Sequence, residues 1–137
     1  MTDLSSGPEG EVVIRTIAMP ADTNPNGDIF GGWLMAHMDL GASTLAHRRA
    51  NGRVATVAVE GMSFLSPVFV GDEVTMYARL VASGRSSMRI SVEAWRRPRL
   101  SPDIIKVTQA VFVFVSIDEH RKPRALPQIA PAIAASD

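Results

Sequence analysis

One segment of the chain, from Gly32 to Ala50, constrains the fold more than any other. It contains no proline, is rich in helix-forming residues, and ends in two arginines followed by Asn51-Gly52, a pattern typical of a helix C-terminus. Large apolar side chains lie on every side of this helix: Trp33, Leu34, Met35, Met38, Leu40 and Leu45. Such a helix is expected to be buried on most of its circumference, so the rest of the chain must curl around it.

The remaining segments predict β-strands. Glu11–Ala18 precedes the helix and Arg53–Glu60 follows it, and both are rich in strand-forming residues. Residues 73–81 and 87–95 alternate apolar and polar side chains, which predicts strands with one buried face. Residues 104–117 end in a stretch that is apolar on both faces, as in a central strand. The order predicts an α+β fold in which five antiparallel strands wrap around one helix, with edge strands that a second copy would cover.

Composition narrows the range of functions. The 137 residues fit a single domain, 1–137, in which we expect residues 1–10 and 128–137 to be flexible. Fourteen basic residues balance fourteen acidic ones, which argues against a broad nucleic-acid or membrane-binding surface. There is no cysteine, so disulfides and thiolate chemistry are excluded. No signal peptide or membrane span is evident, and we expect a cytoplasmic protein.

Asp39 is the most informative single residue. It lies in the middle of the predicted helix, on the same side as Gly32 and Met35, with no basic residue three or four positions away. A buried carboxylate without a partner is costly and needs a reason. Asp39 could cap a neighbouring loop or pair with an arginine from a strand, or it could act in catalysis or ligand binding. Spacing alone leaves these alternatives open.

Gly31-Gly32, at the start of the helix, is a second candidate feature. Glycines permit close approach to the backbone, and free N–H groups at a helix N-terminus favour negative charge. The pair could form an oxyanion site, or it could only let the preceding loop, from Met19 to Gly32, turn into the helix. Asp39 follows about two turns later, so one helix would carry both the oxyanion donors and a base.

Other chemistries find little support in the sequence. His37 lies nearly opposite Asp39 around the helix, and His47 lies about 12 Å further along the helix axis and is turned away. His120 falls in a predicted turn, so neither a dyad nor a metal site is expected. No serine occurs in the context of a hydrolase nucleophile elbow. The turn that contains Arg85, Ser86 and Ser87 is either a polar hairpin tip or a contact for a phosphate or pantetheine group.

Longer motifs resemble one family. The run TIAMPADTNPNGDIFGGWLMAHMDLG, residues 16–41, is similar to the signature of the YciA-type acyl-CoA thioesterases, and the similarity continues through residues 53–74, 84–95 and 122–127. This resemblance implies a hotdog fold, a five-stranded antiparallel sheet around one long helix. It also implies dimers with a continuous sheet, usually assembled as a trimer of dimers, with active sites between subunits and acyl-CoA as the substrate.

The resemblance also implies roles for individual residues. Asp39 matches the catalytic aspartate of the family, and Gly32, with Gly31, matches the glycines whose N–H groups bind the thioester carbonyl. We further expect a set of side chains to contact the substrate: Asn24, Asp28, Phe30, Glu60, Arg85, Ser86 and Ser87.

The sequence therefore predicts an enzyme that hydrolyses acyl-CoA to a free acid and coenzyme A. Asp39 would act as a general base on water, or as a nucleophile through a mixed anhydride. No metal or other cofactor is expected, because coenzyme A enters only as part of the substrate. Two alternatives remain: a hotdog hydratase or dehydratase acting on acyl-CoA, which would need a histidine near the carboxylate, and a binding module without catalytic activity.

Overall fold

The computed structural model describes residues 6–128 of the chain. Its elements in order are β1 (Glu11–Ile17), the 3₁₀ helix η1 (Pro20–Asp22), α1 (Gly31–Ala50), β2 (Val54–Phe64), β3 (Glu73–Ser83), β4 (Ser87–Arg97) and β5 (Ile105–Ser116). Within these residues the strands form one five-stranded sheet in the order β1-β3-β4-β5-β2, antiparallel throughout. The predicted α+β class is confirmed. No helix in the described part of the chain is long and apolar enough to cross a membrane.

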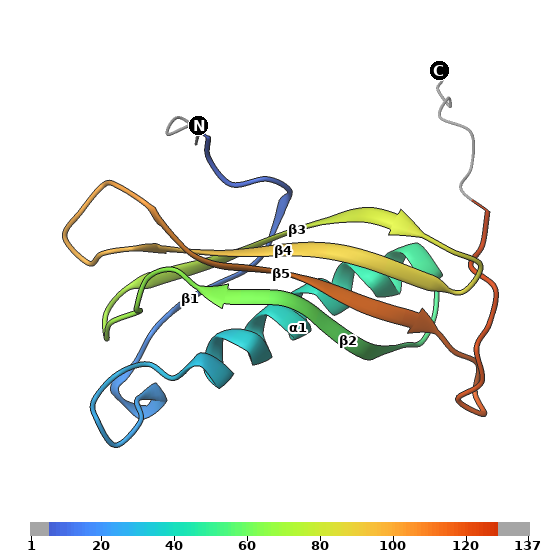
Figure 1. The fold of residues 1–137 in the computed structure, drawn as a ribbon, viewed down its shortest axis with the longest axis horizontal. Helices are drawn as coiled ribbons and strands as arrows, with labels where there is room; N and C mark the ends of the chain where they lie inside the picture. The colour runs from blue at the N-terminus through green and yellow to red at the C-terminus, as the bar shows by residue number, and fades with distance from the viewer. Residues whose placement is uncertain (1–5, 129–137) are drawn as a thin grey trace.

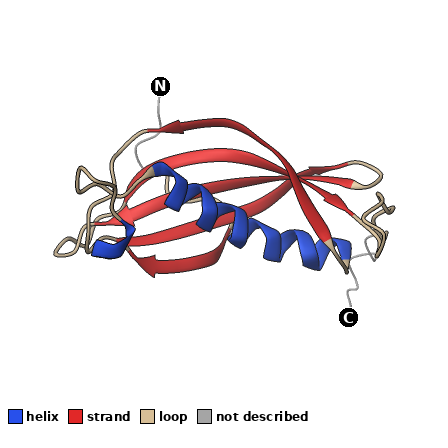
Figure 2. Ribbon diagram, turned by 90° about the horizontal axis from the view of Figure 1, so that it is seen from below, coloured by secondary structure: helices blue, strands red, loops and turns tan. Residues whose placement is uncertain are grey.

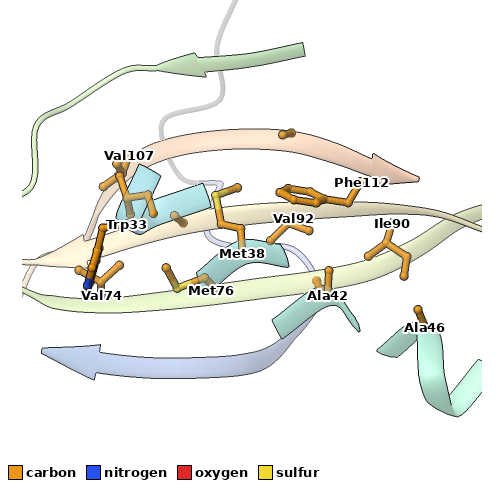
Figure 3. Close-up of a cluster of buried hydrophobic side chains, with 14 of the residues drawn as sticks. Trp33, Met38, Ala42, Ala46, Val74, Met76, Ile90, Val92, Val107 and Phe112 are labelled. Atoms are coloured by element: carbon orange, nitrogen blue, oxygen red, sulfur yellow. The ribbon is translucent and has the colours of Figure 1, made fainter. Parts of the chain in front are cut away.

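The sheet is curved, and α1 lies lengthwise against its concave face (Figures 1 and 2). The helix contacts all five strands. Between them lies the core, which Figure 3 shows as a cluster of apolar side chains contributed by α1 and the three central strands. Met38, Met76, Ile90 and Phe112 are each completely buried there. The alternation predicted for β3 and β4 is thus confirmed for their inner face.

The sequence predicted a helix that is buried on most of its circumference, but the structure shows α1 covered on one broad side only. Trp33, Met38 and Ala42 face the sheet and are buried, whereas Met35 is 39% exposed and Leu40 is 62% exposed. Burial on most sides is therefore wrong for one chain alone, because a single small sheet reaches only one broad side of α1. The open side of the helix is visible in Figure 2.

Strand β2 extends four residues beyond its predicted end at Glu60. Gly61 has a φ of 66°, and the pairing with β5 shifts register between Glu60 and Ser63 before it resumes. A glycine in this conformation allows a β-bulge, so the strand bends and continues instead of stopping. The bulge carries Phe64, the last residue of the strand, to the start of α1, where it becomes part of a pocket.

The last residues of the predicted flexible leader pack closely against strand β3. Gly10 has a φ of 108°, and a Cβ at this position would lie 2.5 Å from the carbonyl oxygen of Ala78. Glu9 forms an ion pair of 3.3 Å with Arg79. Residues 1–5 and 129–137 lie outside the described residues, so flexibility of the leader and of the tail stays a prediction.

Candidate active site

Asp39 lies in the middle of α1 and points toward the edge strand β2. Its side chain is partly exposed, and its Oδ1 accepts a hydrogen bond of 2.6 Å from the hydroxyl of Thr56. No ion pair within residues 6–128 involves Asp39, so the structure does not support pairing with a strand arginine. The expectation of a buried carboxylate without a partner was wrong, since a hydroxyl contacts one oxygen and solvent reaches the group.

A groove of about 300 Å³ surrounds this carboxylate. Its walls are Gly32, Met35, Ala36 and Asp39 from α1, Thr56 and Val59 from β2, and Phe112 from β5. The predicted placement of Gly32, Met35 and Asp39 on one side of the helix is therefore confirmed. The groove is mostly apolar, with the Asp39 and Thr56 side chains as its polar groups. Such a site can position a small polar reactant, such as a water molecule, against an apolar ligand.

The N-terminus of α1 offers free hydrogen-bond donors. Phe30 is the N-cap residue, and its side chain makes no capping hydrogen bond. Trp33 donates its N–H to the carbonyl of Phe30 at 3.1 Å. The N–H groups of Gly31 and Gly32 come earlier in the first turn, where an α-helix provides no internal acceptor. These donors and the helix dipole favour a negatively charged or polarised oxygen at this position.

The loop before the helix is shaped by Asn24. Its side-chain Oδ1 accepts hydrogen bonds from the backbone N–H groups of Asn26, at 2.9 Å, and of Asp28, at 3.1 Å. Its own N–H donates to the carbonyl of Asp28 at 2.7 Å. Asp28 is exposed, and Phe30 is 44% exposed beside Gly32. In this structure Asn24 orders the loop, and contact of these three residues with a substrate stays a prediction.

Glu60 lies away from the groove within one chain. Val59 faces Asp39, so the next residue of the strand points to the other face of the sheet. There Glu60 forms an ion pair with Arg89 of β4.

The turn that contains Arg85, Ser86 and Ser87 lies at the opposite end of the sheet from Gly31, beside the C-terminus of α1 (Figure 1). Its backbone carbonyls accept hydrogen bonds from Leu126 and Ser116. One chain therefore does not bring Glu60 or this turn to Asp39, and their contacts with a substrate stay a prediction.

Sequence reasoning missed Thr56. It is a single hydroxyl in a β-rich strand, and nothing in the spacing marks it. The histidine positions agree with the prediction: the Nδ1 of His37 contacts the carbonyl of Trp33 at 2.8 Å, on the side of the helix away from Asp39. Within the described residues no cluster of His, Asp and Glu side chains could hold a metal ion.

Comparison with known proteins agrees with this geometry. Residues 26–102 match the thioesterase superfamily. The acyl-CoA thioester hydrolase YciA of Salmonella typhimurium is 54% identical over 130 residues, which is 93% of this chain and 98% of that protein.

Solved structures match as well. A hexameric thioesterase from Yersinia pestis superimposes with a TM-score of 0.86 at 52% identity, covering 89% of this chain and 99% of the other. An acyl-CoA hydrolase from Staphylococcus aureus, solved with butyryl coenzyme A and coenzyme A, gives a TM-score of 0.78 at 28% identity, covering 85% and 71%. The chain belongs to the thioesterase superfamily and, within it, to the YciA-type acyl-CoA thioester hydrolases.

Proposed function

We propose that this chain hydrolyses acyl-CoA thioesters to a free carboxylic acid and coenzyme A, with Asp39 as the general base. The observation that carries the proposal is the Asp39 carboxylate in an open, mostly apolar groove, with one oxygen bound by Thr56 and the other without a hydrogen-bond partner among residues 6–128. The high identity to acyl-CoA thioester hydrolases supports the same substrate class. The proposal includes the cytoplasmic location that the sequence predicts.

In the proposed reaction, Asp39 accepts a proton from a water molecule as the water oxygen attacks the thioester carbonyl carbon. The carbonyl oxygen becomes an oxyanion, which backbone N–H groups at the start of α1 stabilise. Removing one such donor costs about 3 kcal/mol in other enzymes. The tetrahedral intermediate then collapses, the C–S bond breaks, and the sulfur takes up a proton as coenzyme A leaves. Direct attack by Asp39, through a mixed anhydride, is the alternative route.

We further propose that each site is composed of two copies of the chain. Gly32 and Asp39 are seven residues apart, a rise of about 10 Å along the helix. The free N–H groups of an N-terminus also point away from the helix body, and therefore away from Asp39. A thioester within hydrogen-bond distance of Gly32 would lie too far from the Asp39 of the same chain. A second copy that supplies Gly31-Gly32 to the Asp39 of the first removes this conflict.

The surface around the groove supports such an assembly. Leu40, next to Asp39 in α1, is 62% exposed, and Val57, next to Thr56 in β2, is 58% exposed. Strand β2 is paired only with β5 among the described strands. An apolar helix face beside an unpaired strand edge is typical of an interface between copies. The Yersinia pestis relative is a hexamer, which supports a trimer of dimers here. Contacts of the coenzyme A portion with Arg85, Ser86 and Ser87 would then come from a neighbouring copy.

The two alternatives are weaker. A hydratase or dehydratase would need a histidine at the carboxylate, and His37 contacts Trp33 instead. A binding module would bind acyl-CoA without releasing thiol, unlike the acyl-CoA thioester hydrolases that this chain resembles. Release of free thiol from acetyl-, butyryl- and palmitoyl-CoA tests all three: we expect thiol release from at least one of these substrates without added metal. Enoyl-CoA hydration without thiol release, or tight binding without turnover, would reject the proposal.

Thr56 is expected to hold Asp39 in its working orientation. Thr56→Val keeps the shape of the side chain but removes the hydroxyl that donates to Oδ1. Hydrogen bonds to charged groups contribute about 1.5 to 3 kcal/mol, so we expect kcat to fall roughly 10- to 100-fold with little change in KM. Thr56→Ser, which keeps the hydroxyl, is the control and should retain most activity. Equal activity of the two variants would remove Thr56 from the mechanism.

A further inference from the structure

A second pocket lies beside the start of α1, separate from the groove that holds Asp39. It has a volume of about 390 Å³ and is lined by Gly31 together with a set of mostly apolar side chains, including Ile29, Leu34, Phe64, Leu65, Pro67 and Val68. A Cβ added to Gly31 would lie 2.8 Å from Cζ of Phe64, so the ring packs directly on the first turn of the helix. The pocket therefore begins at the free N–H groups to which we assign the thioester carbonyl.

One wall of this pocket, residues 65–68, is held in place by Arg96 of β4. Its Nε donates to the hydroxyl of Ser66 at 3.2 Å, and its Nη1 binds the carboxylate of Asp72 at 3.2 Å. The side chain of Arg96 is 12% exposed and that of Asp72 is 5% exposed. The guanidinium also lies over the ring of Phe69, 5.3 Å from its centre. Arg96 is thus largely buried and bridges Ser66 to Asp72, and it holds this wall together with the hydrogen bond of 2.7 Å from the N–H of Leu65 to the carbonyl of Val107.

We infer that the acyl chain of the substrate occupies this pocket and that Arg96, acting through residues 65–68, sets the chain length that the pocket accepts. The inference rests on the proposed function, because it takes the thioester carbonyl to lie at the N–H groups of Gly31 and Gly32. From that point the chain runs along Leu34 and Phe64 toward Val68. Arg96 touches neither the acyl chain nor the reacting atoms, so it is a positioning residue.

The pocket volume sets how much of an acyl chain can be in contact with its walls. A water molecule has roughly 30 Å³ of liquid volume, and a methylene group is similar in size, so 390 Å³ accommodates on the order of ten chain carbons. Each methylene that enters an apolar site contributes enough to change an equilibrium or rate by roughly two- to fourfold. We therefore expect kcat/KM to rise steadily from acetyl- to octanoyl-CoA and to stop rising at longer chains.

The test measures this chain-length series for the wild type and for Leu65→Asp. Leu65 is 65% exposed, so the chain should still fold when a carboxylate stands at the pocket wall. We expect the ratio of kcat/KM for octanoyl-CoA to kcat/KM for acetyl-CoA to fall at least tenfold relative to the wild type. Leu100→Asp is the matched control: Leu100 is 97% exposed and does not line the pocket, so its series should equal that of the wild type.

Two further variants keep the inference open to refutation if Leu65→Asp fails to fold. Phe64→Ser removes the ring at the pocket mouth and should make kcat/KM nearly independent of acyl chain length. Arg96→Gln should lower the ratio of octanoyl to acetyl activity, and Arg96→Lys should restore part of that ratio. If Arg96 had a purely structural role, its variants would instead lower the melting temperature and lower kcat/KM for all substrates by the same factor. Thiol release from the wild type that does not depend on chain length would overturn this inference alone, and so would folded Leu65→Asp and Phe64→Ser variants that keep the wild-type series. No thiol release from any acyl-CoA would instead overturn the proposed function.

Discussion

An Asp39→Asn variant is expected to lose roughly 10²- to 10⁴-fold in kcat, the usual contribution of a positioned general base. The amide has the same size as the carboxylate and still accepts the hydrogen bond from Thr56, but it cannot take a proton from water. KM for acyl-CoA should change much less, because the acyl and coenzyme A portions bind elsewhere. Initial rates of thiol release at saturating substrate measure both constants.

Stability distinguishes this role from a structural one. Asp39 is partly exposed and forms no ion pair among residues 6–128, so the amide should leave the melting temperature nearly unchanged. Asp72 supplies the contrast, because it is 5% exposed and paired with Arg96. Asp72→Asn should lower the melting temperature markedly, as expected when one member of a buried pair is lost. If Asp39→Asn melted far lower yet turned over normally while folded, Asp39 would be a structural residue and the mechanism would be wrong.

The sequence was sufficient to predict the helix and to predict which side chains of the strands face the core. Both follow from local patterns, such as the proline-free segment that ends at Asn51 and the alternation along residues 73–81 and 87–95. Asn51 adopts the left-handed conformation, with a φ of 51°, that ends the helix as predicted. Asp39 and Gly32 could be placed on one side of the helix because the helical period is fixed by backbone geometry.

The partner of Asp39 could not be found in this way. Thr56 and Val59 both line the groove although they are three residues apart, which strict alternation along a strand forbids. The register between β2 and β5 shifts between Thr56 and Ala58, and this bulge turns both side chains to the same face. A bulge without a glycine leaves no local mark, so the pairing of Thr56 with Asp39 emerges only from the assembled sheet.

If each active site is composed of two copies of the chain, two inactive variants should restore activity when they are combined, and the first step is a variant that lacks the oxyanion donor. Gly32→Pro deletes one N–H donor at a position in the first turn where proline is tolerated. A Cβ at Gly32 would lie 3.4 Å from the ring of Phe30, so the Cβ that the proline and alanine variants share fits at this position. We expect kcat to fall by about 10²- to 10³-fold, as for loss of an oxyanion donor. Gly32→Ala adds the same Cβ but keeps the N–H, and should remain far more active.

Asp39→Asn and Gly32→Pro are each nearly inactive, but chains of the two kinds produced together should be active. In a mixed symmetric dimer one site combines the intact Asp39 of one chain with the intact Gly32 of the other, while the second site has both defects. Random pairing makes about half of the dimers mixed, so activity should reach about one quarter of wild type. If each site were built from one chain, every site would keep one defect and the mixture would be no more active than its parents. Native mass spectrometry shows whether mixed dimers form, and Asp39→Asn produced together with wild type, expected at about half activity, is the control for exchange. Mixed dimers that remain as inactive as the parent variants would place both groups in one chain, which the rise of α1 between Gly32 and Asp39 makes physically difficult.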